Sequence, residues 1–220
     1  MIKYNTPQEL FTAICDKIRD KTNSNELINH QDIPDKIDKL LTSNDIKLFI
    51  DSAIQGKNTI CYSFNNTTIT KISSKIFATT NLTNIDLPEC TSICDMAFQD
   101  CTNLTTVNLP ECTTLGYQTF SGCYNLTTVN LPKCTSADMG PGFESYGSFY
   151  DCNNLTIVIL GDGLVSNLPS MFGNTPIANG TGYIYVPDNV LNEYRSNNPN
   201  YQFKPISELP SNLKEEYGYE

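Results

Sequence analysis

The chain has 220 residues and a formal net charge of −10 at pH 7, with 14 lysines and arginines against 24 acidic residues. Its length allows one large domain or two small ones. Because the sequence holds no basic stripe that could neutralise phosphates, we do not expect nucleic acid as a partner.

No apolar run approaches the length that crosses a bilayer, so we expect no membrane insertion. The opening residues MIKYNTPQEL lack the basic and apolar regions of a signal peptide. From the sequence alone we therefore expect a protein that is cytoplasmic as synthesised, and leave open its association with a virion or a cell surface.

The first 44 residues are predicted to be a helical region. Thr6, Pro7 and Glu9 form a capping box with proline at the first helical position, which predicts a helix over residues 6–20. A second short helix is predicted to begin near Pro34. The phrases TPQELFTAICDKIRDKT and INHQDIPDKIDKL resemble the N-terminal segments of small tail-associated proteins of phages and their bacterial relatives. We interpret residues 1–44 as a cap that shields the first coil of the repeat region, a role compatible with attachment to a particle.

Residues 45–176 carry an internal repeat. Leu82, Leu104 and Leu126 are 22 residues apart, and Leu155 follows after 29. A fixed period in the twenties predicts a solenoid. Residues at the same position of successive copies form what we call a column. Three columns are aliphatic and one is aromatic: Leu82/Leu104/Leu126/Leu155, Ile85/Val107/Val129/Val158, Leu87/Leu109/Leu131/Leu160 and Phe77/Phe98/Phe120/Phe149/Phe172.

Each aliphatic triplet predicts a short strand, because apolar and polar residues alternate with a period of two. Pro88, Pro110 and Pro132 are predicted to end these strands. One strand per coil makes a narrow parallel sheet, while Ile93/Leu115/Ala137 and the phenylalanines form the opposite wall. A degenerate first coil is predicted to start near Ile60, with Tyr62 and Phe64 on its strand.

The pattern N-L-x-x-[IV]-x-L-P-x-C-x-x-[IL] followed by F-x-x-C resembles the BspA-type leucine-rich repeat. This resemblance implies an α/β solenoid, a right-handed superhelix closed by end caps. It also implies a surface-exposed binding module, although a shared fold does not identify a ligand.

Six of the nine cysteines lie in two columns of the repeat, Cys90/Cys112/Cys134 and Cys101/Cys123/Cys152. We expect free thiols that pack between coils, since cysteine behaves as a small apolar residue. Disulfides between neighbouring coils and a metal site are the alternatives. The cysteines lack paired C-x-x-C spacing, and His30, the only histidine, is far upstream, so no metal is predicted.

The third copy of the repeat carries seven extra residues, within 138–148. Glycine and proline predict a protruding loop there, with Met139, Phe143 and Tyr146 as candidate binding residues. The alternative is a tolerated surface insertion.

Residues 177–220 are predicted to be a C-terminal cap. The stretch YIYVP at 183–187 alternates as a final strand, and a helix carrying Val190, Leu191 and Tyr194 follows. The last residues, LKEEYGYE, are predicted to fray.

No catalytic arrangement is evident, because His30 is the only candidate histidine base and no phosphate-binding glycine motif occurs. We therefore expect a non-enzymatic protein without a cofactor. The candidate binding face consists of the outward strand positions, which are polar until the last coil: Asn84, Asp86, Thr106, Asn108, Thr128, Asn130, Ile157 and Ile159. The alternative is that the polar ones are simply solvated.

Ile157 and Ile159 should be covered, because the other face of their strand is already apolar. Either the C-terminal segment or a second subunit could cover them, so a homo-oligomer stays open. The leading hypothesis is a binding or adhesion module for a protein or a surface glycan. The alternative is a phage tail-associated structural or host-recognition protein.

Overall fold

The computed structural model describes residues 62–65, 70–75, 77–80, 82–138, 147–164, 168 and 171–219, and of residues 62–65 only the strand. The helices predicted over residues 6–20 and after Pro34 lie outside the described residues. So do the proposed cap at 1–44 and the boundary between residues 44 and 45, which stay predictions.

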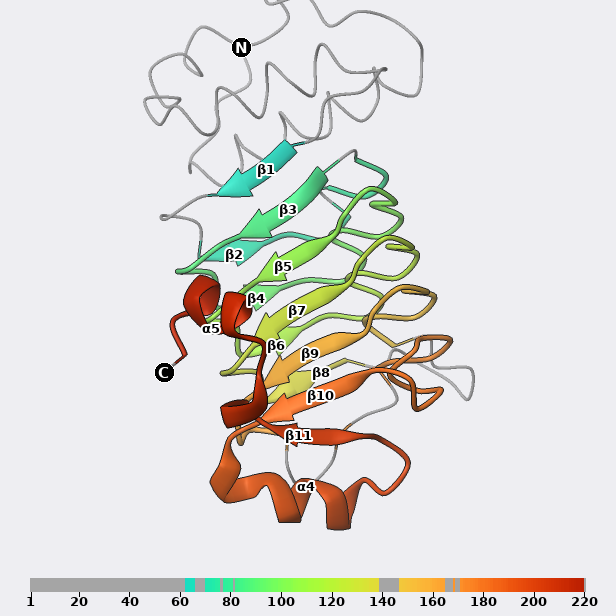
Figure 1. Cartoon of the computed structure of the whole chain (residues 1–220). Helices are drawn as coiled ribbons and strands as arrows, with labels where there is room; N and C mark the ends of the chain where they lie inside the picture. Colours follow the sequence, from blue (N-terminus) through green and yellow to red (C-terminus); the bar gives the residue numbers. More distant parts are fainter. Residues whose placement is uncertain are drawn as a thin grey trace, which may run out of the picture.

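The main element is a parallel sheet of seven strands in the order β1-β3-β5-β7-β9-β10-β11, which descends through the molecule in Figure 1. Each coil of the chain contributes one strand, and consecutive coils are neighbours in the sheet. The strands are β1 Tyr62–Asn65, β3 Leu82–Asp86, β5 Thr106–Asn108, β7 Thr128–Leu131, β9 Ile157–Leu160, β10 Tyr183–Val186 and β11 Phe203–Pro205.

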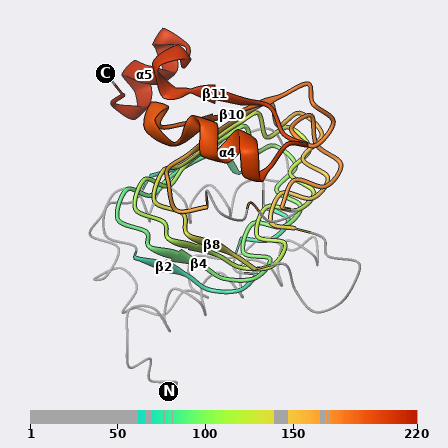
Figure 2. The ribbon, with the colours of Figure 1, turned by 90° about the horizontal axis from the view of Figure 1, so that it is seen from below.

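A second, four-stranded parallel sheet forms the return path of the coils. It has the order β2-β4-β6-β8, from β2 Lys71–Ile72, β4 Ser92–Ile93, β6 Thr114–Leu115 and β8 Ser136–Ala137. Viewed along the stack, the two sheets lie on opposite sides of the coil (Figure 2). The predicted opposite wall is therefore itself a sheet, in which Ile72, Ile93 and Leu115 are buried.

The strand pairing confirms the predicted register. Ile85 lies opposite Val107, Val107 opposite Val129, and Val129 opposite Val158. All three aliphatic columns are buried in one core cluster. Strand β1 pairs with β3, so Tyr62 and Phe64 lie on the strand of a degenerate first coil, as predicted.

The column of phenylalanines forms a continuous aromatic stack. Ring centroids of successive residues from Phe77 to Phe172 are 5.1, 5.3, 5.4 and 5.7 Å apart, and all four pairs are stacked. The five side chains are completely buried. The separation is slightly larger than the ~4.8 Å between hydrogen-bonded strands, as expected for large side chains repeated once per coil.

The two cysteine columns are hydrogen-bonded thiols. Cys101 Sγ donates to the carbonyl of Phe77 at 3.1 Å, and Cys123 Sγ donates to that of Phe98 at 3.3 Å, so each thiol bonds the aromatic residue one coil earlier. In the other column Cys112 Sγ donates to the carbonyl of Thr114 at 3.3 Å. Each of the seven described cysteines is a free thiol.

Burial raises the pKa of these thiols, to about 11 for Cys90 and for Cys101. The thiols therefore stay protonated at neutral pH. In the first and last positions of the second column, Thr80 and Thr175 replace cysteine, and each hydroxyl donates to the phenylalanine carbonyl of its own turn.

A left-handed residue follows each phenylalanine by two positions. Asp100, Gly122, Asp151 and Asn174 have φ values of 57°, 73°, 60° and 56°. Glycine, aspartate and asparagine tolerate this conformation better than other residues. The tight turn therefore explains why four of the five turns carry one of these three residue types, whereas the turn after Phe77 holds Thr79 at φ 62°.

The last coil is closed by β10, the 3-10 turn η2 Asp188–Val190, helix α4 Leu191–Asn197 and β11. Tyr194 of α4 is fully buried, and its hydroxyl donates to the carbonyl of Gly161 at 2.8 Å. The predicted strand and helix are confirmed. The prediction that 183–187 is the final strand is wrong, because β11 adds one more parallel strand beside β10.

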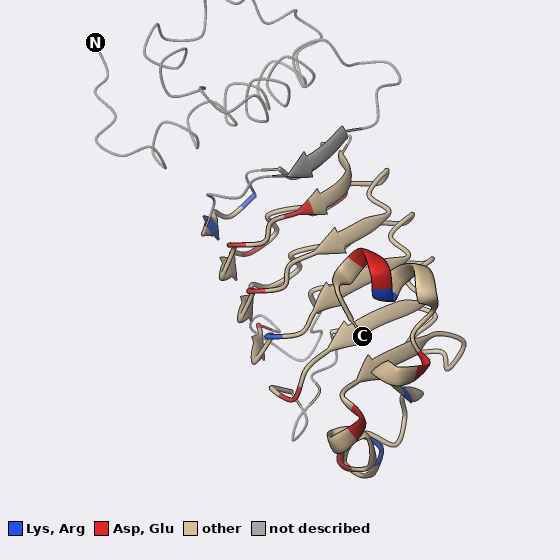
Figure 3. Cartoon of the chain, turned by 60° about the vertical axis from the view of Figure 1, so that its left-hand side comes forward, with Lys and Arg blue, Asp and Glu red and all other residues tan. Residues whose placement is uncertain are grey.

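The prediction of a frayed C-terminus is also wrong. A second 3-10 turn, η3 Ile206–Glu208, leads into helix α5 Ser211–Tyr217. Gly218 then ends the helix in a left-handed conformation (φ 73°), as C-terminal glycines commonly do. This segment lies against the outer surface of the main sheet (Figures 1 and 3).

Together these elements confirm a solenoid with a narrow parallel sheet and a strand-helix cap at its C-terminal end. The described coils contain strands and turns, whereas the described helices lie at the C-terminal end. In the described part of the chain, no helix is both long and apolar enough to cross a membrane. Strands β10 and β11, beyond residue 176, continue the solenoid's sheet.

Candidate binding face

The outward positions of the main sheet form two parallel rows. Strand register places Asn84, Thr106, Thr128, Ile157 and Tyr183 in one row. The second row holds Asp86, Asn108, Asn130, Ile159 and Tyr185. The structure thus brings the eight predicted face residues together on one surface, whose character changes from polar to apolar toward the C-terminus.

The polar half is formed by Asn84, Asp86, Thr106 and Asn108, which we call the open rows. All four side chains are partly exposed. Thr106 Oγ1 donates to Asn84 Oδ1 at 2.8 Å, and Asn108 Nδ2 donates to Asp86 Oδ1 at 2.9 Å. These bonds fix the side-chain orientations, so the open rows are an ordered array of amide, hydroxyl and carboxylate groups.

The same hydrogen-bond chain continues toward the C-terminal coils. Asn130 Nδ2 donates to Asn108 Oδ1 at 2.8 Å, and the hydroxyl of Tyr219 donates to Asn130 Oδ1 at 2.9 Å. Each amide therefore donates toward the N-terminal coils and accepts from the C-terminal side. A phenol from the end of the chain supplies the last donor.

The apolar half of the face is covered by residues 206–219, which we call the C-terminal arm. Ile159 and Tyr185 form a hydrophobic cluster with Leu209 and Leu213 of the arm, separate from the main core. Partly buried Ile157, Tyr183, Ile206, Tyr217 and Tyr219 pack against this cluster. The expectation that the two isoleucines are covered is confirmed, and of the two alternatives it is the C-terminal segment that covers them.

This cover corrects the predicted binding face. Thr128, Asn130 and Ile159 are 6%, 2% and 0% exposed, so these three residues are not an open surface, and Ile157 packs against the cluster that the arm forms. The reason is that α5, which ends at Tyr217, and Tyr219 after it lie against the outward side chains of β7, β9 and β10. The accessible part of the predicted face is the open rows.

The arm buries two phenol groups against the sheet. Burial raises the pKa of Tyr219 to about 12. Burial, with the nearby carboxylates of Glu216 and Asp86 adding to it, also raises the pKa of Tyr217. The Tyr217 hydroxyl is buried without a hydrogen-bond partner among the described residues. The cover is therefore well packed but leaves one polar group unsatisfied.

Three residues of this surface were missed from the sequence, namely Tyr183, Tyr185 and Lys204. The alternation of YIYVP contained the signal for the tyrosines, because register with Ile157 and Ile159 follows once the strand is placed. Lys204 Nζ lies 4.1 Å from the centre of the Tyr183 ring, a cation–π contact. Nothing local in the sequence indicates that contact.

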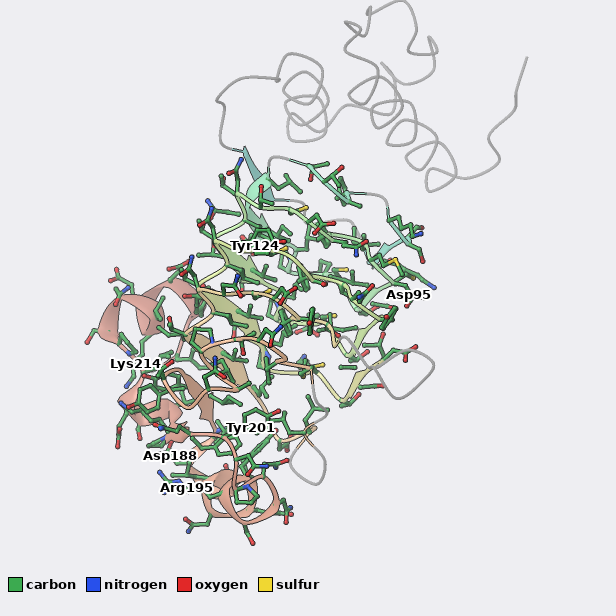
Figure 4. All side chains as sticks on the ribbon, turned by 90° about the vertical axis from the view of Figure 1, so that its right-hand side faces the viewer. Asp95, Tyr124, Asp188, Arg195, Tyr201 and Lys214 are labelled. Atoms are coloured by element: carbon green, nitrogen blue, oxygen red, sulfur yellow. The ribbon has the colours of Figure 1, made fainter. Side chains whose placement is uncertain are left out.

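Charged groups elsewhere stabilise the cap and the edges of the coils. Hydrogen bonding from the Ser207 side chain, and from the Ser207 N–H that donates to Asp188 Oδ1 at 3.2 Å, lowers the pKa of the Asp188 carboxyl. Arg195 donates to the carbonyl of Phe203 at 3.0 Å. Figure 4 shows Asp188, Arg195 and Lys214 at the C-terminal end, away from Asp95 and Tyr124 on the coils.

Over the described residues, no three acidic, cysteine or histidine side chains gather as metal ligands would. Met139, Phe143 and Tyr146 lie outside the described residues.

Comparison with known proteins agrees with this architecture. Residues 70–194 match the BspA type leucine rich repeat region in 6 copies. No curated protein matches the chain. Among solved structures, the crystal structure of the pneumococcal vaccine antigen PcpA is similar, at 18% identity and a TM-score of 0.48 over 67% of this chain and 41% of that one. The family match spans more than half of the 220 residues, and the chain belongs to the BspA-type leucine-rich-repeat family.

Proposed function

We propose that this protein is a non-enzymatic binding module whose open rows contact a protein or a surface glycan. The observation that carries the proposal is the ordered array of Asn84, Asp86, Thr106 and Asn108 on a rigid sheet. The bond from Asn108 occupies one carboxylate oxygen of Asp86, so among the described residues the other oxygen of Asp86 and the lone pairs of the Thr106 hydroxyl can still accept hydrogen bonds from a ligand. Such preorganised polar groups lose little conformational entropy on binding.

The chemistry of the solenoid supports the non-enzymatic part of the proposal. The six column thiols are buried and hydrogen-bonded to backbone carbonyls, and burial raises their pKa. A nucleophilic cysteine needs the opposite shift, because the thiolate is the reactive form. The thiols therefore act as core residues.

A glycan and protein array tests the proposal with Thr106→Arg and wild type. Thr106 is outward on β5 and partly exposed, so arginine there should block contact with the open rows without filling the core. Thr114→Arg is the matched control, because Thr114 is outward and exposed on β6 of the opposite sheet. Loss of array signals in Thr106→Arg but not in Thr114→Arg is expected. Equal binding profiles for wild type, Thr106→Arg and Thr114→Arg would show that the open rows do not contact the ligand.

The second candidate function is that of a phage tail-associated protein, attached through residues 1–44. It is supported by the resemblance of the N-terminal segments to small tail proteins. The genes beside this one provide the test: a tail-assembly cassette would support attachment to a virion, and a cellular operon would reject it.

A further inference from the structure

The C-terminal arm shows what kind of partner the apolar half of the face fits. The surface presented by Asn130, Ile159 and Tyr185 combines one hydrogen-bond acceptor with a flat apolar patch. The arm meets it with Leu209, which is extended between η3 and α5, with Leu213 of α5, and with the phenol donor of Tyr219. We infer that the apolar half is a docking site for a short peptide segment that presents two leucines and a tyrosine, occupied here by the chain's own arm as a releasable latch.

Three observations favour release over permanent packing. First, the arm and its contacts form a cluster distinct from the solenoid core, so the core columns keep their packing when the arm leaves. Second, the arm follows β11 through a 3-10 turn between Pro205 and Pro210, and its helix buries only Leu213. Both features limit the free energy that holds the arm in place.

The third observation is the unsatisfied Tyr217 hydroxyl. Burying a phenol without a hydrogen bond is unfavourable, and this hydroxyl regains water when the arm opens. Opening also exposes Asn130 Oδ1, the acceptor that ends the amide chain of the open rows. A ligand on the open rows could then extend over the apolar half, so the latch sets how much of the face is available.

The site can be tested with the arm itself as the probe. The arm-released variant Leu209→Ser/Leu213→Ser, made in the full chain, is mixed with a fluorescent peptide of residues 206–220, and binding is followed by anisotropy. We expect the variant to bind at least 10-fold more tightly than wild type, whose site is occupied. A Tyr219→Phe peptide should bind roughly 5-fold more weakly, because the bond to Asn130 is lost. If the variant is folded but does not bind the peptide, the inference is wrong.

Hydrogen exchange on the wild-type chain covers the case in which that variant does not fold. If the arm is a latch, the amides of α5 exchange at least 100-fold faster than those of β9. Equal rates would show that the arm opens only with global unfolding, and the inference would be wrong. Neither the peptide-binding test nor hydrogen exchange uses a ligand from outside the chain. If the peptide binds but the glycan and protein array gives no signal, the proposed function is wrong and the latch stands.

Discussion

The hydroxyl of Tyr219 donates a hydrogen bond to Asn130 Oδ1 at 2.9 Å, although 89 positions of chain separate the two residues. This contact joins the end of the chain to the fourth strand of the main sheet. It divides the outward face into open rows near the N-terminal coils and a covered half near the C-terminal coils.

Replacing Tyr219 by phenylalanine should loosen the arm without unfolding the solenoid. The variant loses one partly buried hydrogen bond and leaves Asn130 Oδ1 without its phenol donor, at a cost of about 1 kcal/mol to the local stability of the arm. Hydrogen exchange of the α5 amides should accelerate roughly 5-fold while that of β5 stays constant. Tyr124→Phe, at an exposed tyrosine, is the control. If both variants accelerate hydrogen exchange of the α5 amides equally, the bond between Tyr219 and Asn130 does not hold the arm.

The aromatic stack should be the most sensitive part of the core. Phe120 is fully buried between Phe98 and Phe149, at 5.3 and 5.4 Å. Phe120→Ala should lower the free energy of unfolding by about 3–5 kcal/mol, since it opens a cavity inside a continuous column. Urea unfolding measures this change, with Tyr124→Ala in the same coil as the exposed aromatic control. A loss below 1 kcal/mol for Phe120→Ala would contradict the stacked core.

Alkaline pH should destabilise the solenoid through its thiols. Burial raises the pKa of Cys90 and Cys101 from 9.0 to about 11. The unfolded chain therefore releases these protons first, and stability that is fully present below pH 9 is lost as pH rises toward 11. At pH ~10.5 each such thiol should cost on the order of 2 kcal/mol.

Urea unfolding at several pH values between 8 and 10.5 measures this dependence. Cys101→Ala is the matched control, because it removes one titrating thiol and should flatten the curve. An unfolding free energy that does not change over this range would show that the thiols are accessible to solvent.

The C-terminal closure depends on one buried phenol. The Tyr194 hydroxyl donates to the Gly161 carbonyl at 2.8 Å, and the side chain is fully buried in the main core. Tyr194→Phe keeps the ring but leaves that carbonyl without this donor, so about 1–2 kcal/mol of unfolding free energy should be lost. Thermal unfolding should show a lower midpoint, and an unchanged midpoint would mean that the bond is dispensable.

A surface ion pair should contribute far less. Lys133 Nζ lies 2.7 Å from the Glu111 carboxylate, and the two side chains are 58% and 42% exposed. Solvent and salt screen such pairs, so Lys133→Ala should change the unfolding free energy by less than about 1 kcal/mol. Urea unfolding of Lys133→Ala and Phe120→Ala, measured under the same conditions, compares the two changes. If both variants lose a similar amount of unfolding free energy, coil packing is not the main source of stability.

Periodicity predicted the solenoid because each coil repeats the same physical environment. Val107 and Val129 could be aligned from sequence spacing alone, and the strands pair them as expected. The two-residue strands of the second sheet could not be predicted, because Thr114 and Leu115 carry too little alternation to indicate a strand. Only stacking against the coils on either side makes them pair.

The covered half of the face illustrates a different limit. The need to cover Ile157 and Ile159 could be inferred from their strand, but the covering segment could not be identified. LKEEYGYE contains charged residues that suggest solvent exposure, and Leu213 and the tyrosines become apolar contacts only after β11 turns the chain back over the sheet. That long-range contact has no periodic signal.

The most direct measurement is a set of nuclear Overhauser contacts from the Tyr219 ring in the wild-type chain. The structure predicts contacts from this ring to the Asn130 side-chain amide, and contacts from the Leu213 methyl groups to Ile159. Random-coil shifts for residues 211–219 without such contacts would contradict an outward face divided between open rows and a covered half.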